Sequence, residues 1–222
     1  MYIVLILIML ILPIWASINV KTTFSKYSDV HNSRGLTADQ VARQILDSNG
    51  LYNVSIERIP GNLTDHYDPQ ANVVRLSETV YGKTSVSAIG VAAHECGHAC
   101  QHAEEYTPIK IRTALVPVTN ICSHLWYFAF LLGLVLFESL PQLIYVGIFM
   151  FAAVVLFQLV TLPVEFDASN RALRTLENDC ILDSSEVPKA RKVLRAAAMT
   201  YVTALVVSII QLLRLLAAAK RR

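Results

Sequence analysis

Long apolar runs divide this chain more clearly than any other feature of its sequence. The first twenty residues carry no charged side chain. They contain no basic residue near the start and no good small-residue cleavage site near the end, which disfavours a secretory signal peptide that is removed. We therefore expect residues 1–20 to form an uncleaved membrane anchor.

A second apolar region fills residues 113–164, where Glu138 is the only side chain with a fixed charge. Together with Pro141 it divides the region into two stretches, near 118–137 and 142–162. Each stretch has about the length of 20 residues that a membrane-spanning helix needs. Because the rest of the chain is too short to cover two such helices as a soluble core, we predict a transmembrane helical hairpin.

A third apolar run covers residues 196–213 and is followed by Arg214 and a basic end. The pattern predicts a C-terminal membrane helix with a basic tail over residues 196–222. Whether this helix crosses the membrane or lies against the hairpin stays open at this point.

The placement of Lys and Arg favours one orientation of these helices. Nine of these residues lie within 21–112 and six within 165–195, whereas the loop around Glu138 has none. Because loops rich in Lys and Arg remain in the cytoplasm, we expect both basic segments on the cytoplasmic face, with the N-terminus and the hairpin loop outside. The basic C-terminal tail breaks this rule if the last run spans the membrane.

The overall composition agrees with a membrane protein, since 54% of the residues are hydrophobic and the mean hydropathy is +0.46. The net charge is only +2, and the basic residues are scattered among acidic ones. Nucleic acid is therefore not an expected partner. The four cysteines form no C-x-x-C pair, so we interpret them as packing residues; they are Cys96, Cys100, Cys122 and Cys180.

Between the anchor and the hairpin, residues 21–112 have the pattern of a small α+β unit. Residues 37–49 match an amphipathic helix with a capping box at its start. Residues 54–59 alternate apolar and polar side chains, and residues 72–77 form a second strand candidate. A helical pattern returns over residues 85–105.

This last helix carries the sequence HECGH. His94 and His98 are four residues apart, so both imidazoles project from one face and could hold a single Zn²⁺ ion. Glu95 lies beside the first histidine and can reach a water molecule at the metal as a general base. With six histidines and nine glutamates in the chain, a chance H-E-x-x-H is expected only about 0.006 times, so accident is a poor explanation.

A third zinc ligand has to come from another part of the chain. His102 continues the histidine stripe, but on a straight helix it lies about 12 Å from His94, too far for one tetrahedral site. Glu165 directly follows the predicted hairpin, and two membrane crossings return the chain to the face of the histidines. We expect Glu165 to complete the site. Asp167 is the weaker candidate, and both residues could instead simply mark the membrane boundary.

Several segments together closely resemble the YugP-like neutral zinc metallopeptidases, which are membrane proteases of bacteria. The similarity covers nearly the whole chain and is carried by four segments: HNSRGLT (31–37), LTDHYDPQANVVRLSE (63–78), VAAHECGHACQHA (91–103) and LPVEFDASNRAL (162–173). The resemblance implies that His94, His98 and Glu165 bind zinc. It also implies that Glu95 is the catalytic base.

A more distant resemblance leads to the membrane-bound zincins of the HtpX and CAAX-processing type. In those enzymes the ligand glutamate begins an E-x-x-A-D pattern whose aspartate supports a zinc-bound histidine. Here Ser169 stands in place of that aspartate. By the same analogy, residues 72–77 would be an edge strand to which a substrate peptide adds. The candidates for stabilising the oxyanion are His66, Tyr67, Tyr81 and Arg171.

The sequence thus predicts an α+β, mainly α fold: a membrane-anchored zincin with an HExxH helix, a small β-sheet and a transmembrane hairpin. The expected segments are 1–20, 21–112, 113–164, 165–195 and 196–222. We expect a multi-pass zinc endopeptidase of the cell membrane, cutting peptides or proteins, including membrane proteins, at the cytoplasmic face.

The sequence also bears on two alternative functions. An intramembrane protease would add an Asp-Gly motif in another span, and the chain has no Asp-Gly dipeptide. A membrane scaffold that binds zinc without catalysis remains the alternative, although a purely structural zinc site has no use for Glu95.

Overall fold

The computed structural model describes residues 2–136 and 138–220. The helices within these residues are α1 (Tyr2–Ser28), α2 (Ala38–Ser48), α3 (Val86–Ala103), α4 (Thr107–Val135), α5 (Gln142–Asn178) and α6 (Val187–Lys220). The strands are β1 (Ser55–Ile59), β2 (His66–Asp68) and β3 (Val73–Ser77). The mainly helical class with a small sheet is therefore confirmed.

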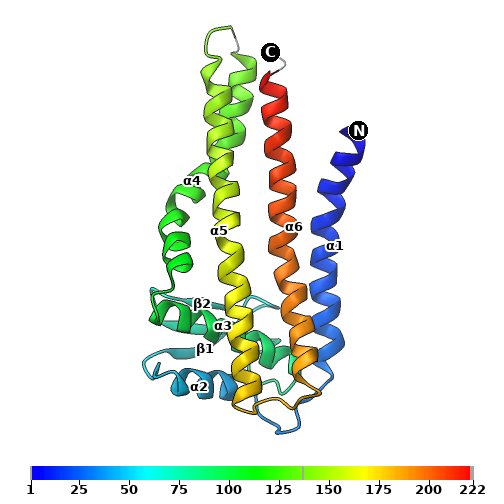
Figure 1. The fold of residues 1–222 in the computed structure, drawn as a ribbon, viewed down its shortest axis with the longest axis vertical. Helices are drawn as coiled ribbons and strands as arrows, with labels where there is room; N and C mark the ends of the chain where they lie inside the picture. Colours follow the sequence, from blue (N-terminus) through cyan, green and yellow to red (C-terminus); the bar gives the residue numbers. More distant parts are fainter. Residues whose placement is uncertain (1, 137, 221–222) are drawn as a thin grey trace.

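Four long helices, α1, α4, α5 and α6, extend from one compact end of the molecule, where the sheet, α2 and α3 lie (Figure 1). Each of the four is long and apolar enough to cross a membrane. Large apolar side chains are exposed along them, for example Ile11, Leu125, Phe149 and Leu213. Helices that are apolar on all sides are typical of membrane spans rather than of water-exposed surfaces.

The long helices continue beyond the apolar runs that predicted them. Apolar residues at their lower ends, such as Phe24, Leu176 and Val193, belong to the core of the compact end. Burial in that core, rather than membrane contact, stabilises these additional turns. Two basic residues of the predicted tail, Arg221 and Arg222, lie outside the described residues, as does Phe137 of the first predicted hairpin span.

Helices α4 and α5 form the predicted hairpin and pack closely through two glycines. A Cβ atom on Gly133 would lie 2.5 Å from the backbone nitrogen of Ile144. A Cβ atom on Gly147 would lie 2.7 Å from the backbone nitrogen of Phe130. Small residues of this kind let membrane helices approach until their backbones touch, so these two positions hold the hairpin together.

The sheet has the strand order β1-β3-β2, with β3 parallel to β1 and antiparallel to β2. The expectation that residues 72–77 form an edge strand is therefore wrong. Val73, Val74 and Leu76 are almost completely buried, and a strand with so apolar a sequence is covered best when both of its edges are paired. The edge position next to α3 belongs to β2, a strand that the sequence pattern did not predict.

Candidate active site

Helix α3 brings the HECGH sequence against α5. The helix begins after Ser85, whose side-chain oxygen accepts a hydrogen bond from the amide of Ala88 at 3.3 Å. Further along, a Cβ atom on Gly97 would lie 2.7 Å from the carbonyl oxygen of Ala168. The two helix backbones therefore touch within one turn of Glu165, which fixes the distance between that carboxylate and the histidines.

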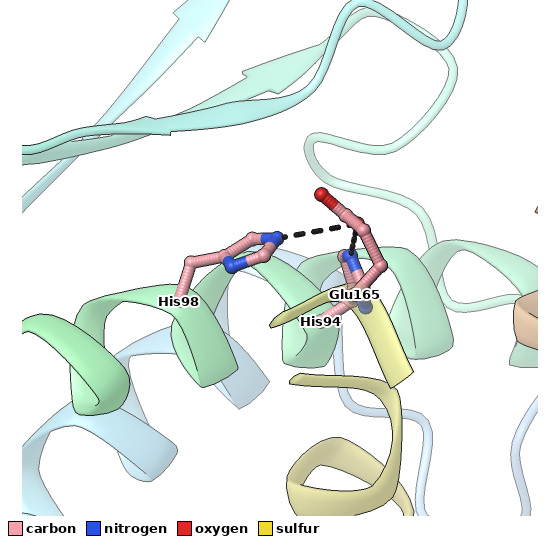
Figure 2. Close-up of side chains that lie close together, drawn as sticks. All are labelled: His94, His98 and Glu165. Carbon is pink, nitrogen blue, oxygen red and sulfur yellow. Dashed lines mark hydrogen bonds and ion pairs between the residues drawn. The ribbon is translucent and has the colours of Figure 1, made fainter. Parts of the chain in front are cut away.

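The side chains of His94, His98 and Glu165 point at one another from α3 and α5 (Figure 2). Oε2 of Glu165 lies 3.3 Å from Nε2 of His94 and 3.6 Å from Nε2 of His98. One ligand atom from each residue lies within 4.8 Å of the others. Among the residues described, this is the one group of His, Cys, Asp or Glu arranged to hold a metal ion. It consists of the three residues that the sequence predicted, and we call it the metal-binding group.

Each histidine is oriented by a partner at its other ring nitrogen. Nδ1 of His94 lies 3.2 Å from Oγ of Ser169, and Nδ1 of His98 lies 3.0 Å from Oε1 of Gln101. When the ring proton of each histidine is on Nδ1 and donates a hydrogen bond to this partner, both Nε2 lone pairs face the carboxylate of Glu165. Three acceptor atoms then converge on one point, an arrangement that needs a cation and whose donor set suits Zn²⁺.

Gln101 is fully buried and is itself held in place by further hydrogen bonds. Its Nε2 atom donates to the carbonyl of Val164 and to Oδ2 of Asp167, both at 2.8 Å. Asp167 also accepts from Nε of Arg171, which donates through Nη1 to Glu104 at 2.7 Å. Asp167 thus positions Gln101 and lies outside the metal-binding group. The guanidinium group of Arg171 is paired with Asp167 and Glu104.

The charges around the metal-binding group favour a bound cation. Glu165 is only 3% exposed, and the nearest fixed positive charge is Nη1 of Arg112, 3.8 Å from its Oε1 atom. Burial by itself lowers the pKa of His98, but the hydrogen bond to Glu165 and the charge of Glu95 outweigh burial and raise it. The group therefore attracts protons when no metal competes for it.

Glu95 is held next to the metal-binding group by the edge strand. Its Oε2 atom accepts a hydrogen bond from the backbone amide of Tyr67 in β2 at 3.0 Å. Tyr67 lies opposite Val74 of β3, but its amide points away from β3 and toward Glu95. The outer edge of β2, on the side away from β3, therefore faces the site. The edge strand beside the site is therefore β2 rather than residues 72–77.

A cleft of about 710 Å³ opens over these residues. Its walls come from β2, from α3, from the first turns of α4 and from α6. His102 lies in the wall, with its ring centroid 5.5 Å from that of Tyr67, which agrees with the expected position outside the ligand set. His66 also lines the cleft, whereas Tyr81 lines a separate hollow beside α2.

Two residues in the cleft were not identified from the sequence. Arg112 of α4 and Tyr201 of α6 both line it together with Glu165. Each lies in or beside an apolar run far from the HECGH sequence, where no local pattern distinguishes it. Only the approach of α4 and α6 to α3 brings them to the site.

Comparison with known proteins agrees with this arrangement. A family model described as "Putative neutral zinc metallopeptidase" matches residues 2–220. The "Putative membrane protease YugP" of Bacillus subtilis (strain 168) is 50% identical over 203 residues, which cover 91% of this chain and 89% of that protein. No solved structure matches the chain. The family match extends from α1 to α6 and includes the metal-binding group, so the chain belongs to this family of neutral zinc metallopeptidases.

Proposed function

We propose that this protein is a membrane-bound, zinc-dependent endopeptidase. In this proposal His94, His98 and Glu165 hold the zinc ion. The observation that carries the proposal is the convergence of their ligand atoms within 4.8 Å at the base of a cleft. Three protein ligands leave one coordination position free, which is the arrangement of catalytic rather than structural zinc sites.

Glu95 acts as the general base of the reaction. When bound, zinc supplies a Lewis acid that polarises the scissile carbonyl and makes a water molecule more acidic. Glu95 accepts the proton of that water and passes it to the leaving amine. Its hydrogen bond to the amide of Tyr67, at 3.0 Å, keeps one carboxylate oxygen fixed while the other remains available for the proton.

The substrate is a peptide that binds in extended form along the outer edge of β2. Among the described residues no strand pairs with the outer edge of β2, and this edge and the cleft beside it support that mode of binding. Arg112 and Tyr201 are suited to stabilise the oxyanion, because both line the cleft next to Glu165 and both can donate a hydrogen bond. The hydroxyl of Tyr67 is less suited, because it donates to Asn72 at 3.0 Å.

The protein crosses the membrane several times, with the active site at the cytoplasmic face. Support comes from the basic segments 21–112 and 165–195, whose Lys and Arg residues gather at the compact end, whereas the α4–α5 loop lies at the far end (Figure 1). Helix α6 ends at Lys220, at the end of the molecule away from the compact part, and Arg214 lies less than two turns before it; both residues depart from the charge rule.

Zinc content and hydrolysis test the enzymatic proposal together. Detergent-purified native protein should contain about one zinc per chain, which Glu165→Ala should lose and Glu177→Ala, an exposed carboxylate on the same helix, should keep. Glu95→Gln should keep zinc but lose hydrolysis of an unfolded protein substrate. Native protein without zinc, or full activity in Glu95→Gln, would overturn the proposal. Zinc without any hydrolysis would indicate a non-catalytic zinc-binding scaffold.

Thiol labelling tests the orientation. Of the four cysteines, all within the described residues, Cys180 alone is exposed, and it lies between α5 and α6 at the compact end. A membrane-impermeant maleimide should label Cys180 only after cells are permeabilised. Ser139→Cys in the exposed α4–α5 loop, in a Cys180→Ser background, should be labelled in intact cells. The reverse pattern would place the active site outside.

A further inference from the structure

A second cavity, which we call the side cavity, meets the cleft at the metal-binding group. The two share five lining residues: Asp65, His94, Glu95, Glu165 and Tyr201. Beyond these, the cleft is bounded by β2, by α4 and by His98 and His102 of α3, whereas the side cavity is bounded mainly by α1, by α6 and by Val91 of α3. The two hollows therefore extend in different directions from the same reacting point.

The walls of the side cavity are apolar. They include Val20 and Phe24 of α1 and Val193, Leu194 and Ala197 of α6. Among the described residues no Lys or Arg lines the cavity, and its three acidic residues are all shared with the cleft, so they lie at the mouth. A charged side chain inside would lose its hydration without gaining a partner, whereas an apolar side chain would be stabilised by leaving water.

The volume of the side cavity is about 240 Å³. Since a water molecule occupies roughly 30 Å³ in the liquid, this is room for roughly eight water molecules. Sites for whole small molecules usually have about 300–1,000 Å³. The side cavity therefore fits one large side chain better than a complete ligand or a lipid chain.

The segment that precedes and forms β2 connects the two hollows. Leu63 and Asp65 line the side cavity, whereas His66, Tyr67 and Asp68 line the cleft. A peptide extended along this segment would pass over the metal-binding group, so the residue next to the scissile bond would place its side chain at the mouth of the side cavity.

We propose that the side cavity binds the side chain of the substrate residue adjacent to the cleaved bond and selects large apolar side chains such as Leu, Met and Phe. This inference rests on the proposed peptidase function and names its specificity. Because the walls come from α1 and α6, the helices that cross the membrane also determine which peptides are cut.

Substitution of Ala197 tests the proposal, because this residue lines the side cavity and is not fully buried. Peptides that carry either Leu or Ala beside the cleaved bond are compared, with the bond located by mass spectrometry. Native protein should cleave the Leu peptide at least about 10-fold better, as kcat/KM, since even one methylene in such a pocket changes specificity by about that factor.

Ala197→Leu should fill the cavity, lower the Leu-to-Ala preference by at least about 10-fold, and leave cleavage of the Ala peptide nearly unchanged. The matched control is Ala204→Leu, on the same helix but lining neither hollow, which should keep the native preference. The same loss of preference should appear in binding: in a Glu95→Gln background, where no turnover takes place, Ala197→Leu should reduce the ratio between the Kd values of the Ala and Leu peptides.

An unchanged preference in Ala197→Leu with zinc retained would overturn the proposal. If Ala197→Leu misfolds and loses its zinc, Leu194→Ala provides the test, because it enlarges the cavity. This variant must shift the preference toward Phe and Trp, and an unchanged preference in Leu194→Ala would also overturn the proposal. A lipid that co-purifies with native protein and is lost from Ala197→Leu, without a change in preference, would assign the cavity to lipid. If native protein cleaves no peptide at all, the proposed function itself fails.

Discussion

The contact between Gly97 and α5 offers a sharp test of how the metal-binding group is positioned. In Gly97→Ala, the new Cβ atom would lie 2.7 Å from the carbonyl oxygen of Ala168, whereas ordinary contacts begin at 3.4 Å. The helices α3 and α5 must therefore separate by about 0.7 Å, the difference between these two distances. Glu165 is carried by α5 and both histidines by α3, so the separation acts directly on the group.

The two consequences of this shift differ in size. Alanine is favoured over glycine within a helix by about 1 kcal/mol, and overpacking costs about 1–3 kcal/mol. The free energy of unfolding should therefore fall by only about 0–2 kcal/mol. Zinc ligand distances, however, are fixed at about 2.0–2.2 Å within about 0.2 Å. A shift of about 0.7 Å exceeds this tolerance, so we expect zinc affinity to fall at least about 10-fold.

Competition with a chromophoric chelator measures the zinc affinity, and thermal unfolding in excess EDTA measures the stability of the metal-free chain. Gly90→Ala is the matched control on the same helix, because its Cβ atom would meet Cβ of Ala190 at 3.5 Å, an ordinary contact. The control should bind zinc normally and be equally stable or slightly more stable. If Gly97→Ala binds zinc as tightly as the native protein, close helix contact is not what positions Glu165.

Three further predictions concern the metal-binding group and the hairpin. Ser169→Ala removes a hydrogen-bond partner of the first histidine and should weaken zinc binding about 10–100-fold without loss of helix content; normal affinity would show that Ser169 does not orient the ring. Gly147→Leu adds a side chain where even a Cβ atom would lie 2.7 Å from the backbone of Phe130, so the Tm in detergent should fall, and an unchanged Tm would contradict the close hairpin contact. Zinc affinity should begin to fall once the pH drops through the pKa of His98 in the metal-free chain, which burial lowers but the neighbouring carboxylates raise above its ordinary value of 6.5. In the metal-free chain this ionisation stabilises the fold fully below pH 6.5 and is lost as the pH rises through the folded-state pKa. Zinc stabilisation has the opposite pH dependence, so zinc content and Tm between about pH 8 and pH 5 check both signs.

The long helices and the metal-binding group could be predicted because their signals are local and repetitive. Apolar runs mark helices regardless of their partners, and the spacing of His94 and His98 is fixed by the helix itself. Glu165 lies far along the chain, yet counting two membrane crossings was enough to bring it to the correct end. Its actual distance to the histidines depends on Gly97, whose role appears only when α5 lies against α3.

The remaining parts of the site depend on contacts that no local pattern records. Strand β2 has only three residues, too few to show alternation, and the edge was expected at residues 72–77 only by analogy with the distant relatives. Gln101 and Ser169 are ordinary polar residues until α3 and α5 bring them to the histidine rings. Arg112 and Tyr201 become candidates only because α4 and α6 close over the cleft.

The site is built from segments that lie far apart in the chain. The segment 21–112 supplies both histidines, Glu95 and Arg112, but Glu165 comes from α5 and Tyr201 from α6. If His94, His98 and Glu165 bind zinc as proposed, a chain in which the hairpin has not yet inserted lacks one of the three ligands, and the remaining two cannot form a complete catalytic set. Zinc binding, and with it peptidase activity, should consequently develop only when α5 and α6 are in place. In the proposed function, proteolysis would thereby be restricted to protein that has reached the membrane.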